Sequence, residues 1–179
     1  MAWATSSRES GNPQETHKFQ QVLDQEFTIK QIFNFRYGRD FIPTMKLLQE
    51  YIGEEKLLEH LKKASSERNT QLGRSLAERW PDNSLHTFAG PFRKRSGLIM
   101  KSSMSYDIVE DTKEAFEIKV TECLTADIFR ESDAADIGFA CVCHADYALP
   151  VAFNPKIKMI LDKTLMEEHD CCNHRYIYG

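Results

Sequence analysis

Residues 116–121 read FEIKVT, and this stretch decides the fold class. Its apolar residues Phe116, Ile118 and Val120 alternate with polar ones, and a period of two is typical of a strand with one buried face. Between residues 15 and 80 the apolar residues instead recur at steps of three and four, which predicts helices. The change of period therefore predicts a helical first part followed by a sheet.

Outward from this stretch, the sequence predicts three further strands and one long helix. The expected elements are a strand at 104–109, a helix at 124–147, a strand at 157–165 and a strand at 171–178. The order strand-strand-helix-strand-strand, preceded by helices, is typical of an α+β fold. We therefore expect N-terminal helices packed with a four-stranded antiparallel sheet.

Two prolines help to divide the helical part. Pro43 lies in the first turn of a helix expected at 41–51, where its missing N–H costs little. A longer helix is expected at 54–79, and Pro81 marks its end.

The chain is predicted to form one domain after a short tail. Residues 1–14 are polar and rich in serine, and we interpret them as disordered. The domain is expected to cover residues 15–179, with a helical part at 15–80 and the strand-strand-helix-strand-strand part at 100–179. A domain of this length can bury a core without disulfides or metals.

Charge and composition exclude several classes of protein. Lysine and arginine number 23 against 27 acidic residues, and a net charge of −4 argues against a nucleic-acid binder, which favours a basic excess. The longest apolar run, residues 137–143, is far shorter than the roughly 20 residues that span a bilayer. The first residues lack the apolar segment of a secretory signal, and the five cysteines are an odd number, so we expect reduced thiols and a cytoplasmic location.

Four of the five cysteines lie beyond residue 140, among other polar residues. On a helix, Cys143 and Asp146 are three residues apart and share a face. On a strand, Cys172 and His174 are two residues apart and point to the same side. The sequence therefore predicts that these four side chains converge.

Three interpretations of this group stay open. Buried thiols often act as small apolar side chains, which we expect for Cys123 and Cys141. A zinc site would need three or four ligands, but neither group has the usual Cys-x2-Cys spacing, so we expect no metal and no other cofactor, with zinc as the alternative. The third interpretation is a catalytic thiol with carboxylate and imidazole partners.

From residue 137 to residue 178 the sequence resembles the L-2-amino-thiazoline-4-carboxylic acid hydrolases. The resemblance rests on the order of four features: Cys143-x-x-Asp146, Asn154-Pro155, an alternating strand at 156–166, and Cys172 followed by an aromatic and basic tail. It implies a hydrolase that opens a cyclic isothiourea at its carbon–sulfur bond and forms an N-carbamoyl cysteine.

Roles for the site residues are implied by this resemblance. Asp146 would accept two hydrogen bonds from the protonated amidine head of the substrate. Cys143 would either attack the ring carbon or shape the pocket while water attacks, and His174 or His144 would transfer the proton. Arg175 would bind the substrate carboxylate. The residues expected to bind substrate are Asn154, Cys172, Arg175 and His144.

A second functional hypothesis is a binding module without catalysis. In architecture the chain also resembles the small-molecule-binding sensor domains named after vinyl reductases, which would hold a ligand or a metal in the same pocket. Under both hypotheses the partner is a small molecule, and we expect neither nucleic acid nor membrane. The apolar helix face at 19–33 would cover the sheet or seal a homodimer.

Overall fold

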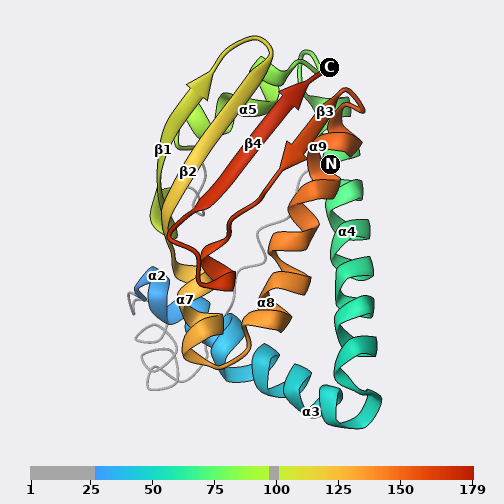
Figure 1. The fold of residues 1–179 in the computed structure, drawn as a ribbon, viewed down its shortest axis with the longest axis vertical. Coiled ribbons are helices and arrows are strands. Elements are labelled where there is room, and N and C mark those ends of the chain that lie inside the picture. The colour runs from blue at the N-terminus through green and yellow to red at the C-terminus, as the bar shows by residue number, and fades with distance from the viewer. Residues whose placement is uncertain (1–26, 97–100) are drawn as a thin grey trace, which may run out of the picture.

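The computed structural model describes residues 27–96 and 101–179, and it has the predicted α+β fold. The tail expected at 1–14 and the first part of the helix expected from residue 15 lie outside the described residues. Figure 1 shows the strands side by side in one sheet, with helices behind it and along one side.

All four predicted strands are present, and they pair in antiparallel fashion in the order β1-β2-β4-β3. The strands are β1 (Met104–Asp111), β2 (Ala115–Cys123), β3 (Ile157–Ile160) and β4 (Cys172–Tyr178). The register places Val120 opposite Cys172 and Phe116 opposite Tyr176, and all four residues are buried. These residues define the inner face of the sheet.

β3 ends at Ile160, earlier than expected. Beyond this residue the side chain of Asn173 accepts hydrogen bonds from the backbone N–H groups of Asp162 (2.9 Å) and Lys163 (2.7 Å). One main-chain bond, from the N–H of Asn173 to the carbonyl of Lys163 (3.3 Å), accompanies them. The chain then turns through a 3-10 helix, η3 (Leu165–Glu167).

The helices at 42–52 and 54–79 closely follow the boundaries predicted at 41–51 and 54–79, and the chain from residue 29 to residue 52 is helical without a break. The N-terminal helices are α2 (Ile29–Phe33), the π-helix η1 (Asn34–Phe41), α3 (Ile42–Ile52) and α4 (Glu54–Arg79). Pro43 lies in the first turn of α3, as predicted. Gly53 separates α3 from α4 with a φ of +88°, a conformation that favours glycine.

One helix was not predicted, namely α5 (Leu85–Arg93). Ser84 caps its first turn, and Phe88 is buried against the inner face of the sheet. Arg93 ends this helix and forms an ion pair with Asp111. The helix is short and contains a proline, so its apolar period was too brief to be recognised.

The prediction of a single helix at 124–147 is wrong, because the chain forms three short helices there and a fourth directly after them. They are α7 (Leu124–Glu131), α8 (Ala135–Cys141), the 3-10 helix η2 (Cys143–Tyr147) and α9 (Ala148–Phe153). Asp133, with a φ of +50°, separates α7 from α8. Val142, with a φ of −120° and a ψ of −69°, separates α8 from η2. The apolar period does not reveal such breaks, because each piece still buries one face.

Two apolar clusters hold these layers together. The first joins α5 and α9 to the inner face of the sheet and includes Phe88, Phe116 and Phe153. The second joins the N-terminal helices to α7 and α8 and includes Leu57 and Phe129. In Figure 1, α8 and α9 lie between α4 and the sheet, so α4 supports the sheet through these two helices.

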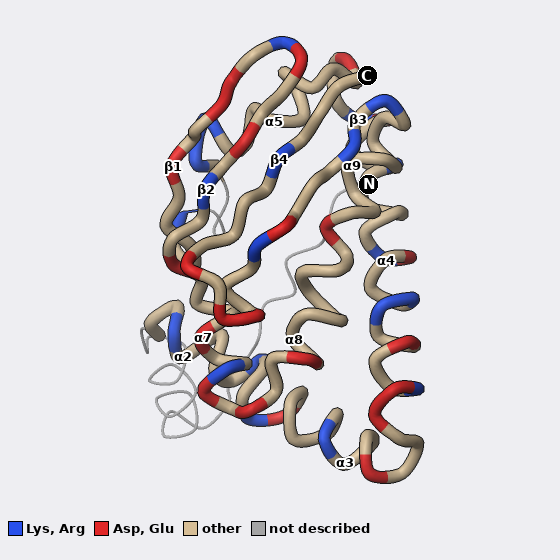
Figure 2. Tube along the Cα trace, in the orientation of Figure 1, with Lys and Arg blue, Asp and Glu red and all other residues tan. Residues whose placement is uncertain are grey.

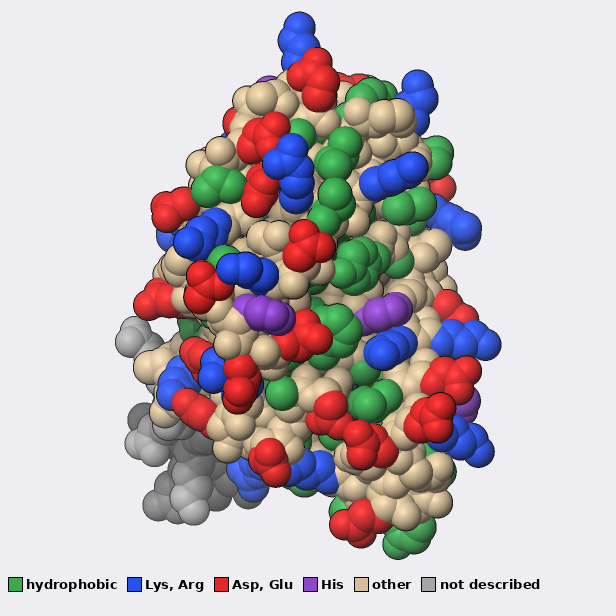
Figure 3. Space-filling view, viewed as in Figure 1, with side chains coloured by type: hydrophobic (Ala, Val, Ile, Leu, Met, Phe, Trp, Pro, Cys, Tyr) green, Lys and Arg blue, Asp and Glu red, His purple; other side chains and the backbone are tan. Residues whose placement is uncertain are grey.

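Charged residues of both signs are interspersed along the chain, as Figure 2 shows for α4 and for the strands. The face of the molecule in Figure 3 likewise mixes acidic and basic side chains. Among the helices that the structure describes, none is long and apolar enough to cross a membrane.

Candidate active site

The break at Val142 creates the candidate site. In the 3-10 helix η2, residues three apart lie almost directly above one another. Cys143 and Asp146 therefore share one edge of η2. The predicted common face is correct, although the helix that provides it is not the expected α-helix.

Helix α4 holds this broken segment in place. Its Ser65 hydroxyl donates to the carbonyl of Ala140 (2.9 Å), and its Asn69 amide donates to the carbonyl of Ala145 (2.9 Å). A helix that ends leaves carbonyl groups without partners, and these side chains supply them. Ser65 and Asn69 are buried and four residues apart, so they form one stripe on α4. Two polar residues on the buried side of a helix were a signal that our reading of the sequence missed.

Replacement of Asn69 by alanine should lower the free energy of unfolding by about 1–3 kcal/mol, because the buried carbonyl of Ala145 would lose its donor. Urea denaturation of the full chain measures this change. Gln71→Ala is the matched control, since this amide is exposed on the same helix and should change stability little. Equal effects of the two substitutions would contradict the assigned role of Asn69.

Asp146 is half-buried, and none of the described residues donates a hydrogen bond to its carboxylate. Burial raises the pKa of Asp146 to about 7, while the nearby positive charge of Arg68 lowers it. A buried carboxylate without a partner is costly to ionise. The group therefore changes its protonation state near neutral pH, which is typical of functional carboxylates.

The pKa values of two thiols and a phenol depend on the charge of this carboxylate. Burial raises the pKa of Cys172 to about 11, and it also raises the pKa values of Cys143 and Tyr176. The negative charge of Asp146 adds to the rise in pKa at all three groups. The backbone N–H of Leu165 also donates to the Cys172 sulfur at 3.2 Å. All three groups are therefore protonated at neutral pH.

His174 lies between Cys172 and Tyr176 on the inner face of β4, opposite Ile118. Its ring is half-buried and receives no hydrogen bond from the described part of the chain. Burial lowers the pKa of His174 to about 4, so the imidazole is neutral at pH 7. His174 shares this face of β4 with Cys172, and Cys143 shares an edge of η2 with Asp146. We call Cys143, Asp146, Cys172, His174 and Tyr176 the Asp146 site.

A sequence model described as L-2-amino-thiazoline-4-carboxylic acid hydrolase matches residues 33–176. The chain belongs to this family. The match runs from the end of α2 into β4 and includes every residue of the Asp146 site. A comparison with curated proteins found no match.

Arg175, Asn154 and His144 were also expected to bind substrate. Each of them makes contacts outside the Asp146 site. Arg175 lies on the outer face of the sheet and forms ion pairs with Glu110 (2.5 Å) and Glu117 (2.9 Å). Alternation along β4 puts it on the side opposite His174, so it does not face the Asp146 site. The Asn154 amide nitrogen donates to the carbonyl of Asn83 (2.7 Å), and its oxygen accepts from the N–H of Lys156 (2.9 Å).

His144 is directed toward α4 rather than toward the Asp146 site. Its Nδ1 atom lies 3.3 Å from the Ser66 hydroxyl. Burial lowers the pKa of His144, and the positive charge of Lys62 lowers it further. This contact joins η2 to α4.

The remaining cysteines of this family member differ in their surroundings. Cys141 is buried, and its thiol donates to the carbonyl of Gly138 (3.8 Å). Cys123 packs against both apolar clusters, and Cys171 is buried beside Asp170. Within residues 27–96 and 101–179, no group of three or more His, Cys, Asp or Glu side chains is placed to hold a metal ion.

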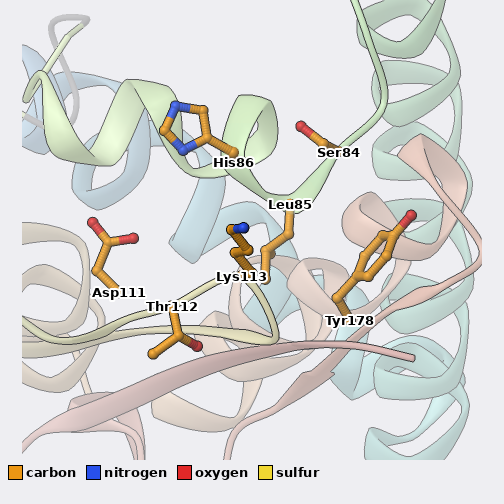
Figure 4. A pocket seen from close by; sticks show the side chains of 7 residues that line it. All are labelled: Ser84, Leu85, His86, Asp111, Thr112, Lys113 and Tyr178. Atoms are coloured by element: carbon orange, nitrogen blue, oxygen red, sulfur yellow. The ribbon is translucent and has the colours of Figure 1, made fainter.

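A surface hollow of about 410 Å³ lies at the opposite end of β4 from Cys172. Figure 4 shows that Ser84, Leu85 and His86 line it from α5 and that residues 111–113 face them from the β1–β2 turn. Tyr178 closes one side. This hollow contains no residue of the Asp146 site, so we do not assign the family chemistry to it.

Proposed function

We propose that the protein hydrolyses L-2-amino-thiazoline-4-carboxylic acid or a closely related cyclic isothiourea at the Asp146 site. The observation that carries this proposal is the half-buried carboxylate of Asp146, which has no hydrogen-bond partner among the described residues. The family to which the chain belongs supports the same substrate class.

The carboxylate suits the head of such a substrate. A protonated 2-amino-thiazoline presents two N–H groups side by side, and a carboxylate can accept both. Because Asp146 is costly to ionise alone, a cation that pairs with it restores favourable electrostatics. The pairing also withdraws electrons from the ring carbon and favours attack there.

The proposed reaction adds one water to this carbon. The oxygen of the water becomes the carbonyl oxygen of the product, and the carbon–sulfur bond breaks with its electron pair on sulfur. One proton of the water ends on that sulfur. The other is released, because the protonated ring nitrogen already carries its hydrogen. The neutral imidazole of His174 accepts the first proton and returns it to sulfur.

The protonated thiol of Cys143 favours water as the attacking group. A thiol whose pKa is raised by burial and by a neighbouring carboxylate is a poor nucleophile. We therefore propose that Cys143 forms a wall of the pocket. Cys172, whose sulfur accepts a backbone hydrogen bond, has the same role on the sheet side.

Replacement of Cys143 by alanine should leave turnover within about tenfold of wild type, because only a pocket wall is altered. If Cys143 were the nucleophile, its replacement would instead lower turnover on the order of a thousandfold or more. Mass spectrometry of the ureido product measures the rate. Cys141→Ala is the matched control, since this thiol is buried in the core beside the same turn.

The proposed function itself is tested by incubating the purified full-length chain with L-2-amino-thiazoline-4-carboxylic acid. We expect a product that is heavier by one water and carries a new thiol. Binding of the acid without any product would instead favour the non-catalytic binding module. Neither binding nor product from this acid would contradict the proposal.

A further inference from the structure

Arg68 extends from α4 to the break that creates the Asp146 site. It directly precedes Asn69, whose amide holds the carbonyl of Ala145, the residue before Asp146. Its own Nη2 atom lies 3.5 Å from the carbonyl oxygen of Cys141, at the end of α8. The guanidinium therefore lies on the same side of α4 as the broken segment.

The side chain of Arg68 is available to a ligand. Arg68 is exposed and makes one long hydrogen bond, so most of its five donors remain free. Within the part of the chain that the structure describes, no carboxylate forms an ion pair with it. Arg93 and Arg175, in contrast, are engaged by Asp111 and by the two glutamates beside β4.

Arg68 is also close enough to act on the buried groups electrostatically. Its positive charge lowers the pKa of Asp146 against the larger effect of burial. It acts in the same direction on the pKa of Cys141. The guanidinium of Arg68 and the carboxylate of Asp146 thus carry opposite charges but form no hydrogen bond with each other among the described residues. Both groups therefore keep hydrogen-bonding capacity for a ligand.

We propose that Arg68 binds the carboxylate of the substrate whose amidinium head is held by Asp146, so that the site selects zwitterionic ring acids over rings that lack the acid. This inference rests on the proposed function and assigns to Arg68 the role that the family resemblance implied for Arg175. The arrangement complements a zwitterion, since each charge of the ligand meets its opposite. A guanidinium suits a carboxylate because it can donate two parallel hydrogen bonds.

The test compares two substrates in the wild type and in Arg68→Gln. The substrates are L-2-amino-thiazoline-4-carboxylic acid and 2-amino-2-thiazoline, which has the same ring without the acid. We expect Arg68→Gln to raise the KM of the acid about 10- to 100-fold, as for loss of a charged hydrogen bond, and to leave kcat within about threefold. The KM of the ring without the acid should not change, so the preference of the enzyme for the acid should collapse.

Two further variants exclude a general loss of structure or charge. Arg74→Gln removes an exposed arginine from the same helix and should keep the wild-type preference. Arg68→Lys keeps the charge without the forked geometry and should restore part of the preference. An unchanged ratio between the two substrates in Arg68→Gln would overturn the assignment.

Failure of this inference can be told apart from failure of the proposed function. If the wild type turns over neither compound, calorimetric titration with the acid replaces the kinetic measurement. Tight binding that weakens in Arg68→Gln but not in Arg74→Gln would support Arg68 and contradict hydrolysis. Equal binding by all variants would overturn the role of Arg68.

Discussion

Replacement of Asp146 by asparagine should abolish turnover of the thiazoline acid and, at the same time, stabilise the fold at neutral and alkaline pH. The expected loss of kcat/KM is roughly a thousandfold or more, because a neutral amide can neither pair with the amidinium nor support the charge that develops during attack. The shape of the side chain is preserved, so a folding defect would not explain the loss.

The stability change follows from the direction of the shift in pKa. The pKa of Asp146 is about 7 in the folded state, against 3.8 for the free side chain, because burial disfavours its charge. The folded state therefore binds more protons than the unfolded state between about pH 4 and pH 7, and stability falls as the pH rises through this window. Above pH 7 the ionised Asp146 lowers the free energy of unfolding of the wild type by up to about 4 kcal/mol. Asp146→Asn cannot ionise and does not lose this stability.

Chemical denaturation at a series of pH values measures this difference. The variant should be the more stable protein above pH 7, and the two unfolding free energies should approach each other near pH 4. Asp136→Asn is the matched control, since this carboxylate is exposed on α8. A variant with normal turnover, or one less stable than wild type at pH 8, would contradict the assignment of Asp146.

Replacement of Gly73 by alanine should lower the free energy of unfolding by about 2–3 kcal/mol, although alanine is favoured over glycine within a helix by about 1 kcal/mol. A Cβ atom at Gly73 would lie 2.5 Å from the carbonyl oxygen of Leu149 and 3.1 Å from the nitrogen of Phe153. Both are backbone atoms, so α9 would have to move away from α4. Because α9 follows η2 directly, this movement would also displace Asp146 and reduce activity.

Thermal and chemical denaturation measure the effect, and Gly90→Ala is the control. Gly90 lies inside α5, and a Cβ atom there would meet nothing within 4 Å. We expect Gly90→Ala to keep or slightly raise stability. If Gly73→Ala is as stable and active as Gly90→Ala, the close contact between α4 and α9 does not determine the site.

The local spacing of apolar residues predicted the helices and strands that bury one continuous face. The alternation at Phe116, Ile118 and Val120 gave the central strand, and the apolar period gave α4 with its observed limits. The same periods placed Cys143 with Asp146 on one edge of η2 and Cys172 with His174 on one face of β4. These inferences depend only on neighbours along the chain.

The features that were missed depend on distant partners. The break at Val142 is stabilised by Ser65 and Asn69 of α4, which no local period reveals. The early end of β3 depends on the side chain of Asn173. Arg175 is a different case, since the same alternation that placed His174 inward excludes its neighbour from the site.

The long-range hydrogen bonds from α4 have a consequence for how the protein folds. The bonds of Ser65 to Ala140 and of Asn69 to Ala145 join residues 75 and 76 positions apart, and Cys172 comes later still. Closing loops of this length costs chain entropy that only the assembled core repays. The contacts that hold η2 therefore form only together with the rest of the core, and a chain truncated before β4 lacks Cys172, His174 and Tyr176 altogether.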